Sequence, residues 1–219
     1  MSEVIITVRG EHELRLAPER ATVHLSVTFD GPERADVVER TLAAAEPVRT
    51  GLEARKASAA VTEWTSRRLS VYADRPWNSD GRRLAPVYRA SIDFTGTFAD
   101  FSELSVWVTE LTVQDGVSIG AVDWHLTPET EAEVEREVAT QAVGVAVSRA
   151  RAYAEALGLS TVAPREIADR GLISESVPIM PKMMMARSAA LPMDSGPSLE
   201  LQGEEITVSA AVEGRFAAS

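Results

Sequence analysis

The 219-residue chain contains no cysteine, and only two of its 22 basic residues are lysine. Without cysteine the chain has no disulfide, no thiol nucleophile and no thiolate ligand for a metal. Acidic residues number 33 against those 22 basic residues, which gives a formal net charge of −11. Nucleic acids and anionic membranes require a dense cationic surface, so we expect neither as a partner.

Long hydrophobic runs are also missing. The first ten residues include an acid at Glu3, and their apolar run is interrupted at Thr7. A signal peptide needs a basic start and about 7–15 apolar residues, and a transmembrane helix needs about 18. We therefore expect no membrane insertion and a cytoplasmic protein. With 45% hydrophobic residues, a chain of this length buries enough surface to fold without metal or disulfide, and we expect a single domain over residues 1–219.

Alternation of apolar and polar residues, the pattern of a half-buried strand, predicts most of the secondary structure. The predicted strands are residues 4–16, 21–29, 62–72, 87–98, 117–126, 165–172 and 206–216. Because only Ala17-Pro18-Glu19 separates the first two strands, they are predicted to form a hairpin. The third and fourth strands are predicted to form a second hairpin, whose long tip contains residues 74–81.

Helical spacing of apolar residues predicts three helices. The first follows Asp30-Gly31-Pro32, and Pro47 is expected to kink or split it. The second begins at the N-cap Asp100, which has Glu103 at position N3. The third is Ala-rich, begins after Thr127 and extends over about residues 128–157. Its predicted buried stripe consists of Val138, Ala142, Ala146, Ala150, Tyr153, Ala154 and Leu157.

The resulting order is β-β-α-β-β-α-β-α-β-β, in which hairpins alternate with helices. This order favours an α+β fold with mostly antiparallel sheets. Residues 174–202 interrupt the pattern, because they contain four prolines and three consecutive methionines with little periodicity. We expect this segment to be a mobile excursion from the domain.

Four stretches of sequence together resemble the SIMPL-domain family, a bacterial group of unknown function. They are ITVRGEHELRLAPERATVHLSV at 6–27, VYRASIDF at 87–94, ATQAVGVAVSRARAYAEALG at 139–158 and ITVSAAVEGRF at 206–216. The resemblance covers nearly the whole chain. The resemblance implies an α+β fold. In the family, some members assemble into rings and many are exported to the periplasm. The family takes its name from a partner of an innate-immunity kinase. The resemblance supplies no catalytic residue.

Gly116 to Gly120 fits the G-x-S-x-G pattern of a hydrolase nucleophile elbow, with Ser118 at its centre. An elbow needs a strand before the serine and a helix after it. Here a helix precedes the pattern and a strand follows it, so we interpret the glycines as turn residues. Asp123 and His125 follow on one face of the same predicted strand. We predict no catalytic residue in the chain.

The three histidines are His12, His24 and His125. In the predicted first hairpin His12 and His24 would lie near each other, with Glu11 or Glu13 as candidate further ligands of a metal. Exposed polar positions of a sheet are the simpler interpretation, because the sequence has no H-x-x-x-H spacing, phosphate-binding loop or dinucleotide motif. We therefore predict no metal site and no cofactor.

Exposed apolar residues are the candidate contacts with other proteins. Trp77 lies in the polar hairpin tip with arginines nearby, and aromatic and arginine residues are enriched at protein interfaces. A Trp77 folded back on its own sheet is the open alternative. Consecutive methionines give an adaptable apolar surface. The predicted protein-contact residues are Trp77, Arg82, Arg83, Met183, Met184 and Met185.

Two functions of different classes follow from these patterns. The first is a non-enzymatic, self-associating structural or protein-binding module, a homo-oligomer with sheet edges and an apolar arm as its contacts. The alternative is a weak hydrolase or small-molecule-binding protein that uses a cleft near Trp77 and the 174–202 segment. Buried paired carboxylates or a perturbed histidine in a pocket would support that alternative.

Overall fold

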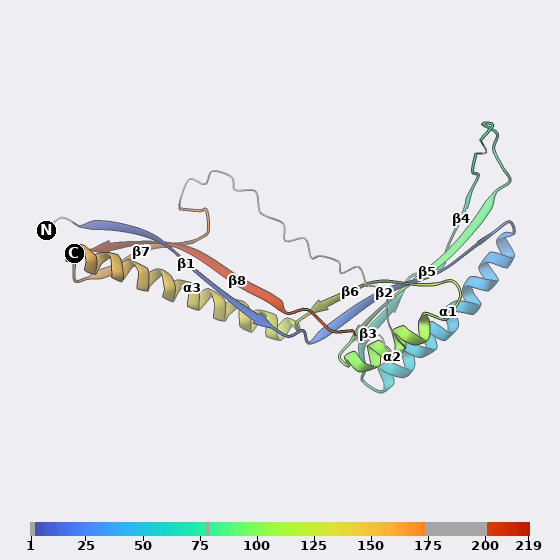
Figure 1. The fold of residues 1–219 in the computed structure, drawn as a ribbon, viewed down its shortest axis with the longest axis horizontal. Helices are drawn as coiled ribbons and strands as arrows, with labels where there is room; N and C mark the ends of the chain where they lie inside the picture. The colour runs from blue at the N-terminus through green and yellow to red at the C-terminus, as the bar shows by residue number, and fades with distance from the viewer. Residues whose placement is uncertain (1–2, 78, 174–200) are drawn as a thin grey trace. The chain divides into compact units, whose positions relative to one another are not determined.

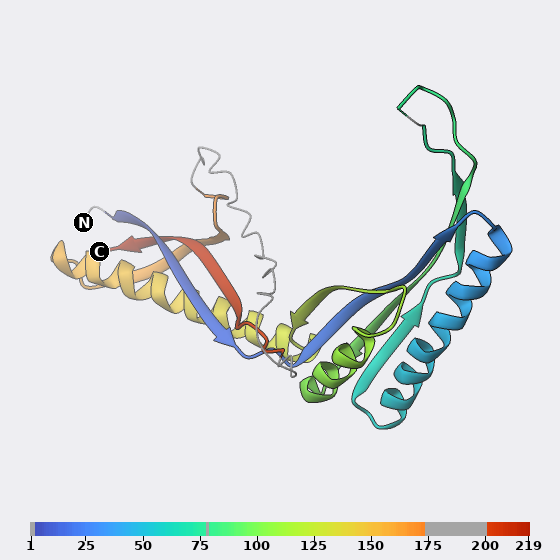
Figure 2. The same cartoon turned by 45° about the vertical axis from the view of Figure 1, so that its right-hand side comes forward.

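The computed structural model describes residues 3–77, 79–173 and 201–219. The chain divides into two compact units: the first combines both ends of the chain with the segment that starts at Leu126, and the second is built on Pro18–His125. Two compact units can still fold as one cooperative domain, so the single domain over residues 1–219 stays a prediction. Each unit is an antiparallel sheet with helices on one face (Figures 1 and 2).

The sheet of the first unit joins the two ends of the chain. It contains β1 (Val4–Leu16), β8 (Ile206–Ala218) and β7 (Val162–Asp169) in the order β1-β8-β7. β1 pairs with β8 over its full length, from Val4 opposite Ala218 to Leu16 opposite Ile206. The predicted hairpin of residues 4–16 and 21–29 is therefore wrong. Alternation identifies the buried face of a strand, but it does not identify the neighbouring strand.

Helix α3 (Pro128–Ala156) lies along this sheet, over β1 and β8 (Figure 1). Its N-cap is Thr127, whose hydroxyl accepts from the Thr130 N–H, as the sequence predicts. Tyr153 and Leu157 do not belong to the buried stripe, because they are 55% and 62% exposed. The buried residues of α3 are Val134, Val138, Ala142, Ala146, Ala150 and Ala154.

Gly10 brings the β1 backbone close to that helix. A Cβ atom placed on Gly10 would lie 1.9 Å from the Ala142 carbonyl oxygen and 2.6 Å from the Ala146 nitrogen. Only a residue without a side chain fits between these backbone atoms. The alanines of α3 and this glycine together set the short distance between helix and strand.

The sheet of the second unit has the strand order β3-β5-β2-β6, and β4 also pairs with β5. The strands are β2 (Arg20–Gly31), β3 (Val61–Ser66), β4 (Ser70–Asp74), β5 (Val87–Phe98) and β6 (Val117–His125). The predicted second hairpin is confirmed, since β3 and β4 both pair antiparallel with β5. Residues 67–69 interrupt the strand predicted over 62–72, which therefore forms β3 and β4.

Helices α1 (Arg34–Ala57) and α2 (Phe101–Leu111) cover one face of this sheet (Figures 1 and 2). Pro47 lies inside α1, and the helix is not split there. Asp100 is the N-cap of α2, as predicted, and its carboxylate accepts from the N–H groups of Ser102 and Glu103. The largest fully buried side chains of this core are Trp107, Phe98, Leu52, Leu104 and Leu111.

The α+β class, the antiparallel sheets and the long third helix are therefore confirmed. None of the helices in the described ranges is long and apolar enough to cross a membrane. The expected excursion at 174–202 lies outside the described residues except for its last two positions.

Candidate functional site

The face of the second sheet that points away from α1 and α2 is polar along its two central strands. Its residues alternate with the buried ones, because successive side chains of a strand point to opposite faces. They are Thr22, His24, Ser26 and Thr28 on β2, and Ser91, Asp93, Thr95 and Thr97 on β5. This pattern matches the interpretation of His24 as an exposed polar position of a sheet.

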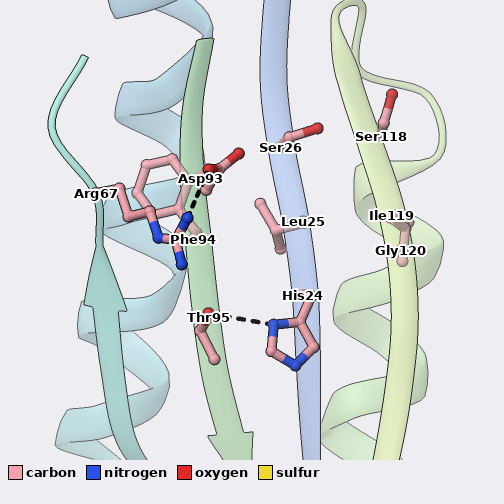
Figure 3. Close-up of a pocket in the computed structure, with 10 residues that line it drawn as sticks. All are labelled: His24, Leu25, Ser26, Arg67, Asp93, Phe94, Thr95, Ser118, Ile119 and Gly120. Atoms are coloured by element: carbon pink, nitrogen blue, oxygen red, sulfur yellow. Dashed lines mark hydrogen bonds and ion pairs between the residues drawn. The ribbon is translucent and has the colours of Figure 1, made fainter. Parts of the chain in front are cut away.

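A hollow of about 310 Å³ opens on this polar face (Figure 3). Ser118 and Gly120 of β6 and Arg67, just beyond β3, complete a lining that includes His24, Ser26, Asp93 and Thr95. The hollow contains one ion pair, between Arg67 Nη1 and Asp93 Oδ2 at 3.8 Å. Arg67 is 82% exposed at its side chain, so this pair is screened by solvent and contributes little to stability.

The histidine in the hollow is already bonded through both of its ring nitrogens. His24 Nε2 lies 3.1 Å from Asp123 Oδ2, and Nδ1 lies 3.4 Å from Thr95 Oγ1. Ser118 lies opposite Ser26 in the ladder, and within the described residues it forms no hydrogen bond with His24. A serine nucleophile needs a histidine nitrogen that can accept its proton, and His24 does not present one to Ser118.

His125 belongs to a separate chain of hydrogen bonds. Its Nε2 lies 2.9 Å from Thr22 Oγ1, which lies 3.0 Å from Thr97 Oγ1. This chain crosses the sheet from β6 to β5 without reaching Ser118. Asp123 and His125, which follow Ser118 in sequence, therefore have different partners, and the three residues do not form a triad.

The two glycines around Ser118 have structural roles. Gly116 has φ +77 in the turn before β6, and a side chain there would collide with the Phe29 ring. Gly120 lies at a shift in the β2–β6 register, with its Cβ position 3.1 Å from the His24 carbonyl oxygen. The interpretation of Gly116 as a turn residue is confirmed, and Gly120 serves a bulge that the sequence did not predict.

The predicted approach of His12 to His24 depended on a hairpin that does not exist. His12 lies on β1 opposite Ala210 of β8, whereas His24 lies on β2 in the other sheet. Among residues 3–77, 79–173 and 201–219, no three His, Asp or Glu side chains are grouped as metal ligands.

Trp77, one of the predicted protein-contact residues, lies in the tip between β4 and β5, whose described residues (75–77 and 79–86) are named here the arm. The Arg83 guanidinium lies 5.0 Å from the Trp77 ring centroid, and an isolated bridge pairs the two backbones. The Trp77 side chain is 62% exposed, so it does not fold back onto the sheet. Arg82 lies in the same tip and also makes a non-covalent contact within the chain. Met183, Met184 and Met185 lie outside the described residues.

The arm and its base present more apolar and cationic groups to solvent. Tyr72 at the base is 51% exposed, and Leu84 in the tip is 48% exposed. The Leu84 N–H donates to the Pro76 carbonyl at 2.8 Å, which closes the tip. The Tyr72 hydroxyl, 3.4 Å from Nη1 of Arg89, raises the pKa of that guanidinium above its ordinary value. Like any arginine, Arg89 is a cation, and it lies next to the Tyr72 hydroxyl at the base of the arm.

The family follows from a comparison with protein-family models. The model described as "SIMPL: Protein of unknown function (DUF541)" matches residues 6–216. The chain belongs to the SIMPL family. A search of curated proteins found no match. The SIMPL match spans strands of both sheets, so the family pattern includes β1 and β8 of the first unit as well as the whole helix-covered sheet of the second.

The arm could be predicted from the sequence, whereas the polar hollow could not. The arm was recognisable because turn residues, Trp77 and arginines are neighbours in sequence. The hollow combines residues from β2, β5 and β6, which become neighbours only through the strand order. Period-two alternation of Thr and Ser residues was its only signal in the sequence.

Proposed function

We propose that this SIMPL-family protein is a non-enzymatic module that associates with itself and binds other proteins. The observation that carries the proposal is Trp77, a large side chain held 62% exposed at the tip of the arm. An exposed Trp contributes nothing to the core of its own unit. Its large apolar surface is stabilised when a second protein surface covers it.

The arm combines three features of an interface hot spot. The Arg83 guanidinium makes a cation–π contact with the Trp77 ring, and an isolated bridge pairs the two backbones. Tyr72 at the base of the arm and Leu84 in its tip are also exposed large hydrophobic residues. Trp, Tyr and Arg are the residues most enriched among those that dominate binding energy. Contacts that restrict Trp77 before binding reduce the conformational entropy that is lost on binding.

The hydrolase alternative has less support. The described hollow is lined by residues of β2, β5 and β6, together with Arg67, and does not include Trp77. Its histidine, His24, is hydrogen-bonded to Asp123 through Nε2 and to Thr95 through Nδ1. An acyl-transfer mechanism would have to break one of these bonds before His24 served as the base of a nucleophile.

Light scattering of the purified protein with the Trp77→Ala variant tests the proposal. We expect the wild-type protein to associate, and the variant to associate at least about tenfold more weakly, as truncation of a hot-spot residue does. Val113→Ala is the matched control, because Val113 is 84% exposed but lies outside the arm. The control should associate like the wild type.

Two results would contradict the proposal. One is a wild-type protein that stays monomeric at high concentration. The other is an association that Trp77→Ala and Val113→Ala leave equally unchanged, which would exclude the arm as the contact.

A further inference from the structure

The four sheet edges of the described chain differ in how they are protected against pairing with another strand. β6 has a register shift at Gly120, β3 has one after Val61, and β7 contains Pro164 followed by a shift. β4, which lies on the same side of β5 as β3, has a continuous register but is only five residues long, and a very short edge strand is also protected. Bulges and prolines are the usual protection of an edge strand. β1 has neither, since its register with β8 is continuous from Val4 to Leu16.

The direction of the β1 backbone groups follows from the bonds of β8. In an antiparallel strand a residue directs its N–H and C=O to one side, and successive residues alternate. The Ala211 carbonyl accepts from the Arg170 N–H, beyond the end of β7. Ser219 likewise exchanges bonds with Thr161, just before β7. Odd-numbered residues of β8 therefore face β7, and even-numbered residues face β1.

The odd-numbered residues of β1 consequently face its free edge, because even residues of β1 pair with even residues of β8. An independent bond agrees: Arg149 of α3 donates from Nη1 to the Arg9 carbonyl at 2.8 Å. The N–H and C=O groups of Ile5 and Thr7 point the same way. They have no backbone partner among the residues that the structure describes.

Charge divides the β1 edge into a protected and an unprotected part. From Arg9 to Arg15 every odd-numbered residue of β1 is charged, and the Arg149 guanidinium also lies at this part of the edge. Residues 4–8 carry no charge, are β-branched throughout, and expose Val4 and Ile5 by 37% and 55%. An uncharged, regular edge of β-branched residues is the kind that pairs with a further strand.

We infer that residues 4–8 of β1 pair antiparallel with the same residues of a second copy, around a two-fold axis at Ile6. This inference rests on the proposed self-association and names one of its contacts. Ile5 then lies opposite Thr7 of the second copy, and the two residues exchange both backbone hydrogen bonds. The reciprocal pair forms on the other side of the axis, and the two sheets become one continuous sheet.

Charge favours this register over its neighbours. Each odd-numbered residue of one copy has to lie opposite an odd-numbered residue of the other copy, because only the odd-numbered residues direct their N–H and C=O groups to the free edge. With the axis at Ile6, Glu3, which pairs with Arg165 in its own chain, lies opposite Arg9 of the second copy, which pairs with Glu213, so this register brings opposite charges together rather than like ones. With the axis at Thr7, Glu3 would lie opposite Glu11, and like charges repel. An axis at Gly10 would centre the pairing next to the Arg9 carbonyl, which Arg149 already occupies, whereas with the axis at Ile6 this carbonyl lies just beyond the paired residues 4–8.

The flank of α3 leaves room for the second copy. Arg149, which reaches the free edge, also lines a shallow groove with Gly144, Ser148 and Ala152. Strands lie about 4.8 Å apart, so two helices that each cover β1 and β8 would lie about 10 Å apart across the axis. Helices pack at about 8–10 Å, and small side chains allow the shorter distance.

Single cysteine variants of the full-length chain test the contact, since the wild-type chain has no cysteine. At the axis, the two Ile6 Cα atoms would be about 4.5 Å apart, within the range of a disulfide. The two Val8 Cα atoms would be about 13 Å apart, which no disulfide bridges. Ile6 and Val8 are 6% and 7% exposed, so Val8→Cys is a matched control. Under mild oxidation Ile6→Cys should form a covalent dimer and Val8→Cys should not.

A second variant blocks the edge without cysteine chemistry. Thr7→Pro removes an N–H that points outward and leaves the β1–β8 bonds intact, whereas Thr7→Val keeps the N–H. We expect Thr7→Pro to weaken association about tenfold or more, and Thr7→Val to leave it unchanged. Circular dichroism should show that both variants are folded.

The outcomes separate this inference from the proposed function. If the wild type associates but Ile6→Cys forms no covalent dimer, or Val8→Cys forms one equally well, the β1 contact is wrong and self-association stands. If folded Thr7→Pro associates like the wild type, the contact is wrong in the same way. A wild-type protein that never associates removes both the contact and the proposed function.

Discussion

Gly10 shows how a single residue sets the packing of the first unit. Any side chain at this position would meet the backbone of α3 at Ala142 and Ala146 rather than a flexible side chain. The helix backbone has to move to make room for it, and overpacking of this kind typically costs about 1–3 kcal/mol or more.

We therefore predict that Gly10→Ala lowers the free energy of unfolding by about 1–3 kcal/mol. Gly144→Ala is the matched control, because no described atom beyond its chain neighbours and its own helix backbone lies within 4 Å of its Cβ position. Gly144 lies inside α3, where Ala is favoured over Gly by about 0.5–1 kcal/mol, so the control should be slightly stabilised. Urea unfolding measured at low protein concentration gives both values. Equal effects of the two substitutions would contradict the packing described for Gly10.

Single residues also show what sequence can and cannot predict. The caps Asp100 and Thr127 were predictable, because a cap bonds to residues two or three positions away. The partners of His24 were not, because Asp123 and Thr95 lie on other strands. A local pattern determines a cap, whereas only the strand order determines which side chains meet across a sheet.

At the scale of elements, helix α2 depends on its cap. Asp100 Oδ1 accepts from the Ser102 and Glu103 N–H groups at 2.9 and 3.1 Å. We predict that Asp100→Ala destabilises the protein by about 0.5–2 kcal/mol, since the first N–H groups of α2 lose their acceptor. Asp100→Asn keeps an acceptor oxygen and should cost less. Thermal unfolding of the two variants makes the comparison, and equal losses would mean that the cap does not act through its oxygen.

Element existence was predictable here, and element partnership was not. Period-two alternation found β1, β2, β5, β6 and β8 to within a few residues. The short link Ala17-Pro18-Glu19 predicted that β1 pairs with β2, whereas β1 pairs with β8, about 200 residues later. The split of residues 62–72 into β3 and β4 also escaped prediction, because the interruption at 67–69 carries no Gly or Pro.

The same partnership creates the edge from which we infer a contact. As the first strand of the chain, β1 has β8 on one side and no described strand on the other. Had the predicted hairpin formed, β2 would have occupied a side of β1. The free edge and the exposed Ile5 on it follow from the observed strand order and could not have been read from residues 4–8 alone.

At the scale of the whole molecule, the polar groups described are used in caps, turns and sheet faces, while Trp77 and Ile5 stay exposed. A two-fold contact at β1 joins copies in pairs, and an arm contact on a different unit can add to those pairs. Association through both surfaces therefore predicts assemblies with an even number of chains.

Sedimentation equilibrium of the unmodified protein over a dilution series tests self-association most directly. We expect species heavier than the 23.6 kDa chain, in even multiples of its mass, that dissociate on dilution. A single species at the mass of one chain across the whole concentration range would contradict it.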